Sequence, residues 1–251
     1  MKFPKFVFLI TLFSSEISDA QDSIPIQTDR PDQTESPFIV SKRHIQFENG
    51  FLFEKEDKNK LNYIHPTILT RIGINNIFEL RLITETVTQE FNNNKTIGFE
   101  PIRAGFKTKL ADEKGIIPTT AFIGHLRFPF FLSDNMSKNS YFPDFRFTMQ
   151  HTINKNLTLG YNLGAQWDEN FNQPNFLYTI TTGYSISENF GTYIELYGFV
   201  SQKTTPDHRF DTGYTYIIKN NIMLDLSGGL GISQKSPSFF VSLGLSFRMQ
   251  N

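Results

Sequence analysis

The feature that most constrains the fold is an alternation of apolar and polar residues that recurs along nearly the whole chain. It is clearest between Ser238 and Met249, where Phe, Val, Leu and Met take every second position and mostly small or polar residues take the others. Side chains on a β-strand point to opposite faces in turn, so this period predicts a strand with one apolar face. A soluble sheet has the same alternation, so the number of such segments and the content of the polar face must decide the class of protein.

The alternating segments follow one another from Ile45 to Met249. There are about twelve of roughly ten residues each, the length that a tilted membrane-spanning strand needs. Their connections alternate between tight turns rich in Asn, Lys and Ser and longer polar loops, which include Phe91–Lys95, Pro129–Phe142 and Asp168–Asn175. Outer-membrane barrels show this asymmetry between their periplasmic and extracellular rims, and an even strand number places both chain ends at the short-turn rim. We therefore expect an all-β, antiparallel up-and-down transmembrane β-barrel over residues 43–251.

Composition agrees with a sheet and excludes several other classes of protein. The 251 residues include 27 Phe and 9 Tyr, which favour pleated surfaces. No apolar run approaches the length of about 18 residues that a membrane-spanning helix requires. A formal net charge of -1 argues against binding of nucleic acid, which needs a basic surface. The absence of Cys excludes disulfides, thiolate metal sites, thiol nucleophiles and a lipoprotein anchor.

The N-terminus has the order of a secretory signal peptide. Lys2 and Lys5 precede an apolar run over residues 6–13, and small residues around Ala20 offer a cleavage site before Gln21. The alternative is a short buried strand or helix at the start of a soluble protein. We assign residues 1–20 to the signal peptide and expect the exported chain to lie in the outer membrane.

The face opposite the apolar one distinguishes a membrane barrel from a secreted or periplasmic β-sandwich. The apolar face carries aromatic residues on strand after strand, which suit a lipid-facing belt with interfacial girdles better than a thin interior between two sheets. We expect the charged residues of the other face to line a lumen: Glu48, Glu79, Arg81, Glu85, Arg103, Lys107, His125, Arg127, Asp144, Arg146, Glu195, Asp211, Asp225 and Arg248. They either tune the selectivity of a pore or form a salt-bridged core.

The last strand also predicts partners. Ser242 to Met249 resembles the C-terminal signal by which outer-membrane barrels are recognised by their insertion machinery: a polar residue, Gly two positions later, an aromatic residue and a final apolar one. Met249 takes the final position, and two polar residues follow it. Insertion machinery and outer-membrane lipid are therefore expected partners.

Three stretches resemble a family of bacterial outer-membrane proteins often labelled "putative MetA-pathway of phenol degradation". They are the opening segment 28–37 with the following 45–51, residues 73–81, and residues 102–110 with the turn to Pro118. The resemblance covers most of the chain after the signal peptide. The resemblance implies a barrel and, more loosely, uptake of small compounds, with aromatic or hydrophobic ones as candidates.

Residues 21–42 form an extended polar segment ahead of the first strand, with helix blocked by Pro25, Pro31 and Pro37. We expect it either to fold into the lumen as a plug or to remain a loose periplasmic tail. In a plug, charges of the segment would pair with wall cations in a space where water screens poorly. The candidate plug residues are Asp29, Arg30, Asp32 and Glu35, and the candidate cations are Arg81, Arg103, Arg127 and Arg146.

The predicted function is an outer-membrane channel for small solutes, with no cofactor, metal or catalytic residues. The alternatives are a structural or adhesion barrel acting through its extracellular loops, and an outer-membrane lipid hydrolase. Five His are scattered without a metal-ligand spacing such as His-Glu-x-x-His, and no local His-plus-Ser motif supports a hydrolase. Solute flux through liposomes separates a channel from a structural barrel.

Overall fold

The computed structural model describes residues 24–56, 60–92, 94–128, 141–168, 171–202 and 204–250, so the predicted signal peptide of residues 1–20 lies outside the described residues. The strands are β1 (His44–Lys55), β2 (Lys60–Asn75), β3 (Phe78–Phe91), β4 (Asn94–Phe99), β5 (Ile102–Ala111), β6 (Thr119–Phe128), β7 (Phe142–Thr152), β8 (Leu157–Asp168), β9 (Phe171–Ser185), β10 (Phe190–Val200), β11 (Asp207–Lys219), β12 (Ile222–Gly231) and β13 (Phe239–Gln250). In this part of the chain there is no helix of the length and apolarity needed to cross a membrane.

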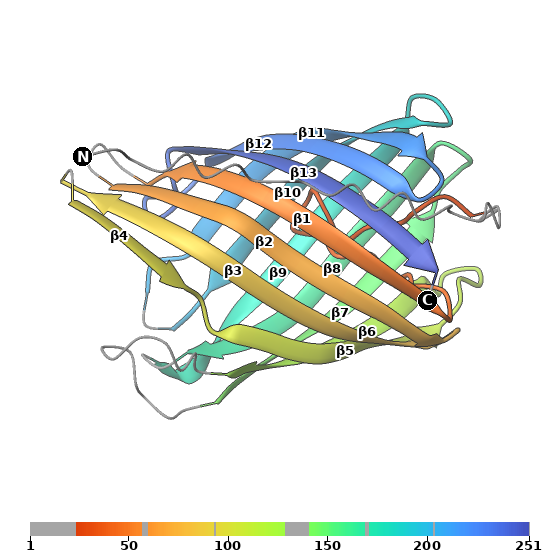
Figure 1. The fold of residues 1–251 in the computed structure, drawn as a ribbon, viewed down its shortest axis with the longest axis horizontal. Helices are drawn as coiled ribbons and strands as arrows, with labels where there is room; N and C mark the ends of the chain where they lie inside the picture. Colours follow the sequence, from red (N-terminus) through yellow and green to blue (C-terminus); the bar gives the residue numbers. More distant parts are fainter. Residues whose placement is uncertain are drawn as a thin grey trace, which may run out of the picture.

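Twelve of these strands form a closed antiparallel barrel, as the sequence predicts (Figure 1). Each strand pairs with its neighbour in the chain, except that β3 pairs with both β4 and β5, and β1 closes the barrel against β13. His44, the first residue of β1, lies opposite Gln250, the last residue of β13. The start and end of the barrel therefore share one rim, which also carries the short β2–β3, β7–β8, β9–β10 and β11–β12 turns.

Short polar side chains form the tight turns at this rim. Asn75 Oδ1 accepts a 2.9 Å hydrogen bond from the backbone N–H of Ile77. Asn154 Oδ1 accepts two hydrogen bonds from backbone N–H groups of the β7–β8 turn, and Ser187 Oγ accepts one from Phe190. Asn and Ser mark these turns because their side chains satisfy backbone groups that the ladder leaves unpaired.

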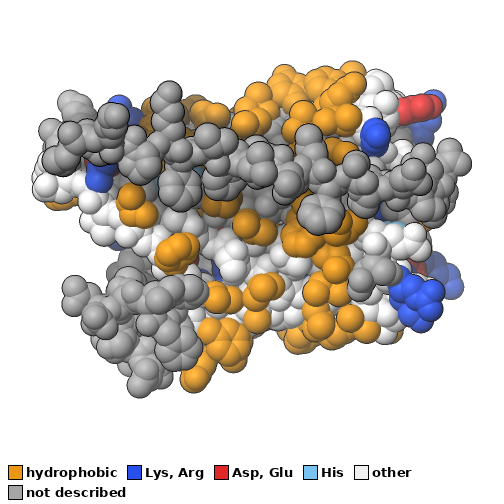
Figure 2. Space-filling view, viewed as in Figure 1, with side chains coloured by type: hydrophobic (Ala, Val, Ile, Leu, Met, Phe, Trp, Pro, Cys, Tyr) orange, Lys and Arg blue, Asp and Glu red, His pale blue; other side chains and the backbone are white. Residues whose placement is uncertain are grey.

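The exposure of side chains along the strands is the reverse of that in a soluble sheet. On β12, Leu224 and Leu226 are 39% and 49% exposed, whereas Asp225 between them is 2% exposed. On β3, Leu80 and Leu82 are likewise exposed, whereas Arg81 is buried. The apolar face therefore points outward and the charged face inward, and groups of hydrophobic side chains lie along the outer wall in the view of Figure 2. Such an exterior is stable in hydrocarbon, where a closed barrel satisfies every backbone hydrogen bond.

Two predicted loops are strands instead. The Asn-rich stretch Phe91–Lys95 contains the end of β3 and the start of β4, which pair from Thr86–Phe99 to Phe91–Asn94. Within the predicted loop Asp168–Asn175, β8 reaches Asp168 and β9 begins at Phe171. The ladder continues because backbone pairing outside the membrane does not need apolar side chains. Apolar alternation alone therefore underestimates the length of these strands. β4 thus adds a thirteenth strand beyond the barrel proper.

Candidate functional site

Residues 24–43, called the N-terminal segment below, run along the inner face of the barrel wall (Figure 1). The backbone N–H of Ile26 donates to Asn220 in the β11–β12 turn at the short-turn rim. Thr34 lies deeper, with its Oγ1 2.6 Å from Thr179 Oγ1 on β9. The N–H of Val40 then donates to Glu79 on β3, and Arg43 donates to Gly73 near the end of β2. The segment therefore enters the barrel from the short-turn rim and returns to it before β1 begins.

Asp29 is the centre of a buried group of charges. Its Oδ2 lies 2.6 Å from Arg81 Nη1, 2.7 Å from Lys107 Nζ and 3.3 Å from Arg71 Nη1. Its own backbone N–H donates to Glu48 Oε2 at 2.8 Å. Burial opposes ionisation of Asp29, but the three cations hold the pKa of this carboxyl well below its usual range.

The wall around Asp29 explains why a carboxylate is needed there. Arg71 on β2 lies directly opposite Arg81 on β3, and Lys107 on β5 opposes Glu79. Arg71 also pairs with Glu48 at 2.9 Å and with Glu79 at 2.8 Å. The three buried cations thus have two buried wall carboxylates among them, and Asp29 supplies the third negative charge. Buried charges are tolerated only when paired in this way.

Glu35 extends the same network towards β7 and β8. Its Oε2 lies 2.6 Å from Arg81 Nη2, and its Oε1 lies 3.4 Å from Arg146 Nη1. Its backbone N–H donates to Asn162 Oδ1 at 2.8 Å, and its C=O accepts a hydrogen bond from the same amide. Burial raises the pKa of Glu35, but Arg81 and Arg146 outweigh this effect and lower the pKa to about 2.

Arg30 docks where the barrel closes. Its guanidinium donates to Asp225 on β12 at 2.8 Å and to Ser242 on β13 at 2.9 Å. Gly50 on β1 and Gly244 on β13 lie directly opposite each other, and a Cβ on either residue would clash with this guanidinium. The paired glycines therefore form a slot in the wall that only the absence of side chains keeps open.

Asp32 has an environment opposite to that of Asp29. The predicted cation partners do not lie beside it; its charged neighbours are Glu195 on β10 and Asp211 on β11. Burial and these two carboxylates raise the pKa of Asp32 well above its usual value. Glu195 itself accepts hydrogen bonds from the Gln33 N–H, at 2.7 Å, and from the Thr34 hydroxyl.

The remaining predicted lumen residues form smaller groups. Glu85 and Arg103 form an ion pair at 2.9 Å, His125 Nδ1 lies 2.9 Å from Asp144 Oδ1, and Arg81 Nε donates to His125 Nε2. Arg248 donates to the backbone C=O of Ile24 at 2.7 Å. Arg127 makes no ion pair with any residue that the structure describes, and the predicted pairing of the segment with Arg103 and Arg127 is absent among those residues.

Arg71 is the main charged residue of the site that the sequence analysis missed. It belongs to the inward face of β2 together with Leu69 and Gly73, all three buried. In the alternation of β2, Ile68 and Ile72 lie on the outward face and Arg71 lies on the inward face, so the pattern itself predicts that Arg71 points into the lumen. Leu69 and Gly73 on the same face obscured it, because they make that face look less polar than the inward faces of the other strands.

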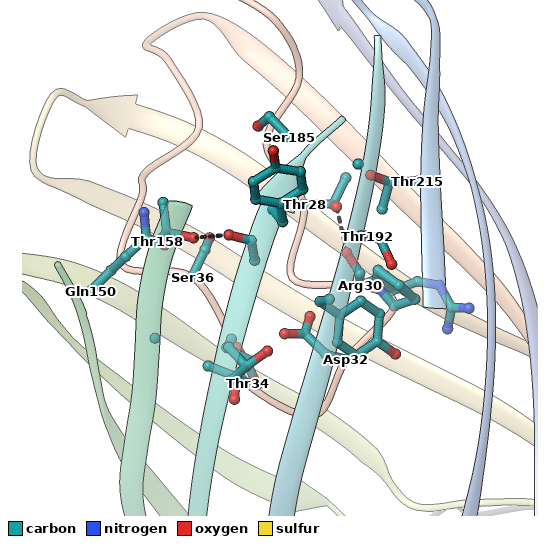
Figure 3. Close-up of a pocket in the computed structure, with 18 of the residues that line it drawn as sticks. Thr28, Arg30, Asp32, Thr34, Ser36, Gln150, Thr158, Ser185, Thr192 and Thr215 are labelled. Atoms are coloured by element: carbon teal, nitrogen blue, oxygen red, sulfur yellow. Dashed lines mark hydrogen bonds between the residues drawn. The ribbon is translucent and has the colours of Figure 1, made fainter. Parts of the chain in front are cut away.

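A cavity of about 240 Å³ lies between the N-terminal segment and the wall formed by β7 to β11 (Figure 3). Most of the lining is small or hydroxyl-bearing: Thr28, Thr34, Ser36, Thr158, Gly160, Thr181, Gly183, Tyr184, Ser185, Gly191, Thr192, Tyr193 and Thr215. The segment adds Arg30, Pro31, Asp32 and Glu35, and the wall adds Met149 and Gln150 on β7. On this side the segment does not fill the barrel. The described residues contain no group of three or more His, Asp and Glu that could hold a metal ion.

Two solved structures share the fold. The COG4313 outer membrane channel from Pseudomonas putida F1 aligns with a TM-score of 0.66 at 10% sequence identity, over 89% of this chain and 100% of that chain. The NanC porin aligns with a TM-score of 0.53 at 11% identity, over 82% of this chain and 100% of that chain. No curated protein matches the sequence.

The family predicted from the opening motif and the two later stretches is confirmed. The family model described as "Putative MetA-pathway of phenol degradation" matches residues 28–249, which include the N-terminal segment from Thr28 onward and nearly the whole barrel. The chain belongs to this family of β-barrel proteins.

Proposed function

We propose that the protein is an outer-membrane channel for small solutes and that its N-terminal segment acts as a plug that narrows the lumen. The observation that carries the proposal is the reversed exposure of the strands, with apolar side chains outside and buried charges inside a closed barrel. That arrangement suits a wall with lipid on one side and a polar passage on the other. The likeness to a channel and a porin and the family's association with phenol degradation support small solutes, aromatic compounds among them.

Export by a signal peptide at residues 1–20, contact with outer-membrane lipid and delivery to barrel-insertion machinery belong to the same proposal. In it, the charged wall residues anchor the plug rather than bind substrate. Asp29 is the principal anchor because it meets three buried cations. We expect no enzymatic activity from the barrel.

The test is the variant Asp29→Asn, reconstituted in planar bilayers beside the wild type. Loss of this carboxylate leaves Arg71, Arg81 and Lys107 with an excess of buried positive charge, so the segment should leave the wall more often. We expect a larger or more frequent conductance step and faster cleavage after Glu35 by a glutamate-specific protease, because trypsin does not cleave the bond between Arg30 and Pro31. The matched control is Asp112→Asn, because Asp112 is 80% exposed and pairs only with Lys109 in the β5–β6 turn.

Unchanged conductance and unchanged cleavage in Asp29→Asn would contradict the plug. Absence of any ion or solute flux through correctly folded wild type and variant would contradict the channel itself and favour a structural barrel.

A further inference from the structure

We propose that the cavity beside the N-terminal segment is the solute-selecting part of the lumen, and that it selects small solutes that donate hydrogen bonds and carry no negative charge. This inference rests on the proposed channel function and specifies its solute class. It starts from the cavity of about 240 Å³ between the segment and strands β7 to β11. This volume is many times the roughly 10–15 Å³ that a cavity needs to hold one water, so it has room for a small solute.

At the depth of Asp29 the opposite wall is filled, so the passage at that depth runs on this side. There the long side chains of Glu48, Arg71, Glu79, Arg81 and Lys107 are fully or almost fully buried against the segment. On the cavity side, Gly160, Gly183 and Gly191 occupy inward-facing positions between hydroxyl-bearing neighbours. A Cβ at Gly183 would lie 2.8 Å from Thr158 Oγ1, and one at Gly191 would lie 2.8 Å from Thr215 Oγ1. The missing side chains at these glycines therefore make room for the threonine side chains beside them, and a larger residue there would push those side chains into the cavity.

The hydroxyl groups around the cavity mostly offer acceptors. Thr28 donates its hydroxyl hydrogen to the Arg30 C=O at 2.7 Å, and Ser36 donates to Asp29 at 2.9 Å. The Thr181 hydroxyl has two acceptors within the protein, the Ile194 C=O at 3.2 Å and the Asp32 carboxyl, and Thr158 faces the Gly183 C=O at 3.5 Å. Each hydroxyl has one hydrogen and two lone pairs, so a hydroxyl that has given its hydrogen to the protein can only accept from a solute.

The charged residues around the cavity also disfavour a negatively charged solute. Arg30, the cation of the lining, already binds Asp225 and Ser242. Glu35 is held by Arg81 and Arg146. Asp32 has carboxylates rather than cations as its charged neighbours, and Figure 3 shows it among the hydroxyl-bearing residues of the lining. A solute carboxylate entering the cavity would meet mainly acceptors, with the Gln150 amide as a neutral donor and the one lining cation already paired, which is costly in a poorly screened space.

The test compares tracer flux of a pentose with that of the corresponding aldonate, its carboxylate counterpart, through liposomes that contain the full chain. Wild type should pass the pentose several-fold faster than the aldonate. In Thr181→Val, which removes an acceptor at constant shape, pentose flux should fall about fivefold, the usual worth of one hydrogen bond, with a smaller change for the aldonate. Gly183→Val, which fills the cavity, should reduce both fluxes.

Gly98→Val is the matched control, because Gly98 lies on the exposed β4 with no atom within 4 Å of an added Cβ. Heat-modifiable electrophoretic mobility confirms that every variant has a folded barrel. A pentose-to-aldonate ratio of one or below in wild type, or the same ratio in Thr181→Val as in wild type, would overturn the inference while leaving the channel intact. Wild-type flux equal to that of protein-free liposomes would instead overturn the proposed function.

Discussion

The wall of β2, β3 and β5 and the wall of β8 to β10 share one alternation of apolar and polar residues but differ in what they leave inside the barrel. The first presents Arg71, Arg81 and Lys107 inward, and the N-terminal segment meets these cations with Asp29 and Glu35. The second presents mainly Thr, Ser and Gly, and a cavity remains beside the segment. The period of a strand thus sets which side faces inward, whereas the size and charge of the inward residues set whether the lumen is filled or open.

The largest effect should come from breaking the charged wall itself. Arg71→Gln leaves Glu48 and Glu79 without their shared cation, and removal of one partner from a buried ion pair typically costs about 3–5 kcal/mol. Urea unfolding in detergent, followed by the fluorescence of the single Trp, measures the loss. Arg103→Gln is the control: its pair with Glu85 is partly exposed, so it should cost no more than about 1 kcal/mol. Equal losses would contradict the special role of the charged wall.

A smaller effect should come from closing the slot for Arg30. Gly50→Ala or Gly244→Ala places a Cβ against the guanidinium, so Arg30 has to leave Asp225. We expect a loss of about 1–3 kcal/mol, as for other overpacked sites, and faster cleavage after Glu35 by the glutamate-specific protease. Gly98→Ala on the open β4 is the control and should behave like wild type. Cleavage at the wild-type rate in both slot variants would show that Arg30 does not occupy the slot.

The third and smallest effect should be a gain in stability of the docked segment rather than a loss. Because the pKa of Asp32 is raised, the folded state binds the carboxyl proton of Asp32 more tightly than the unfolded state does. Loss of that proton therefore destabilises the docked segment as pH rises from about 3.8 through the raised pKa. Asp32→Asn should remove this pH dependence and stabilise the docked segment at neutral pH, by on the order of 1 kcal/mol. Cleavage after Glu35 by the glutamate-specific protease, followed from about pH 4 to about pH 8, measures it. Faster cleavage in Asp32→Asn than in wild type would contradict the carboxylate environment assigned to Asp32.

Much of the fold could be predicted from the sequence because a strand's period is local. The alternation around Leu80 to Leu82 and around Leu224 to Leu226 already separates lipid side from lumen side. The ends of strands were less predictable: β3 and β4 continue to Phe91 and Asn94 through polar residues, where pairing depends on a neighbour's backbone rather than on side-chain pattern.

Less of the site could be predicted, because contacts across the lumen depend on register. The sequence predicts that acidic residues of the segment pair with wall cations, and the structure places Asp29 and Glu35 beside Arg81. It gave no way to see that Asp32 faces Glu195 and Asp211, which lie far away in the chain. The slot at Gly50 and Gly244 depends on the register in which β1 pairs with β13 to close the barrel. The residue pattern of one strand does not reveal its register against another strand.

The most direct test of the central claim, that the N-terminal segment is held inside the barrel, is a cross-link between Thr34 and Thr179. Their hydroxyl oxygens lie 2.6 Å apart, a separation that side chains of a disulfide can meet, and the chain contains no native Cys. The account predicts that Thr34→Cys with Thr179→Cys oxidises within one folded chain and lowers conductance until a reductant restores it. Two free thiols that both react with a water-soluble maleimide in the folded, oxidised protein, with conductance unchanged by reductant, would contradict it.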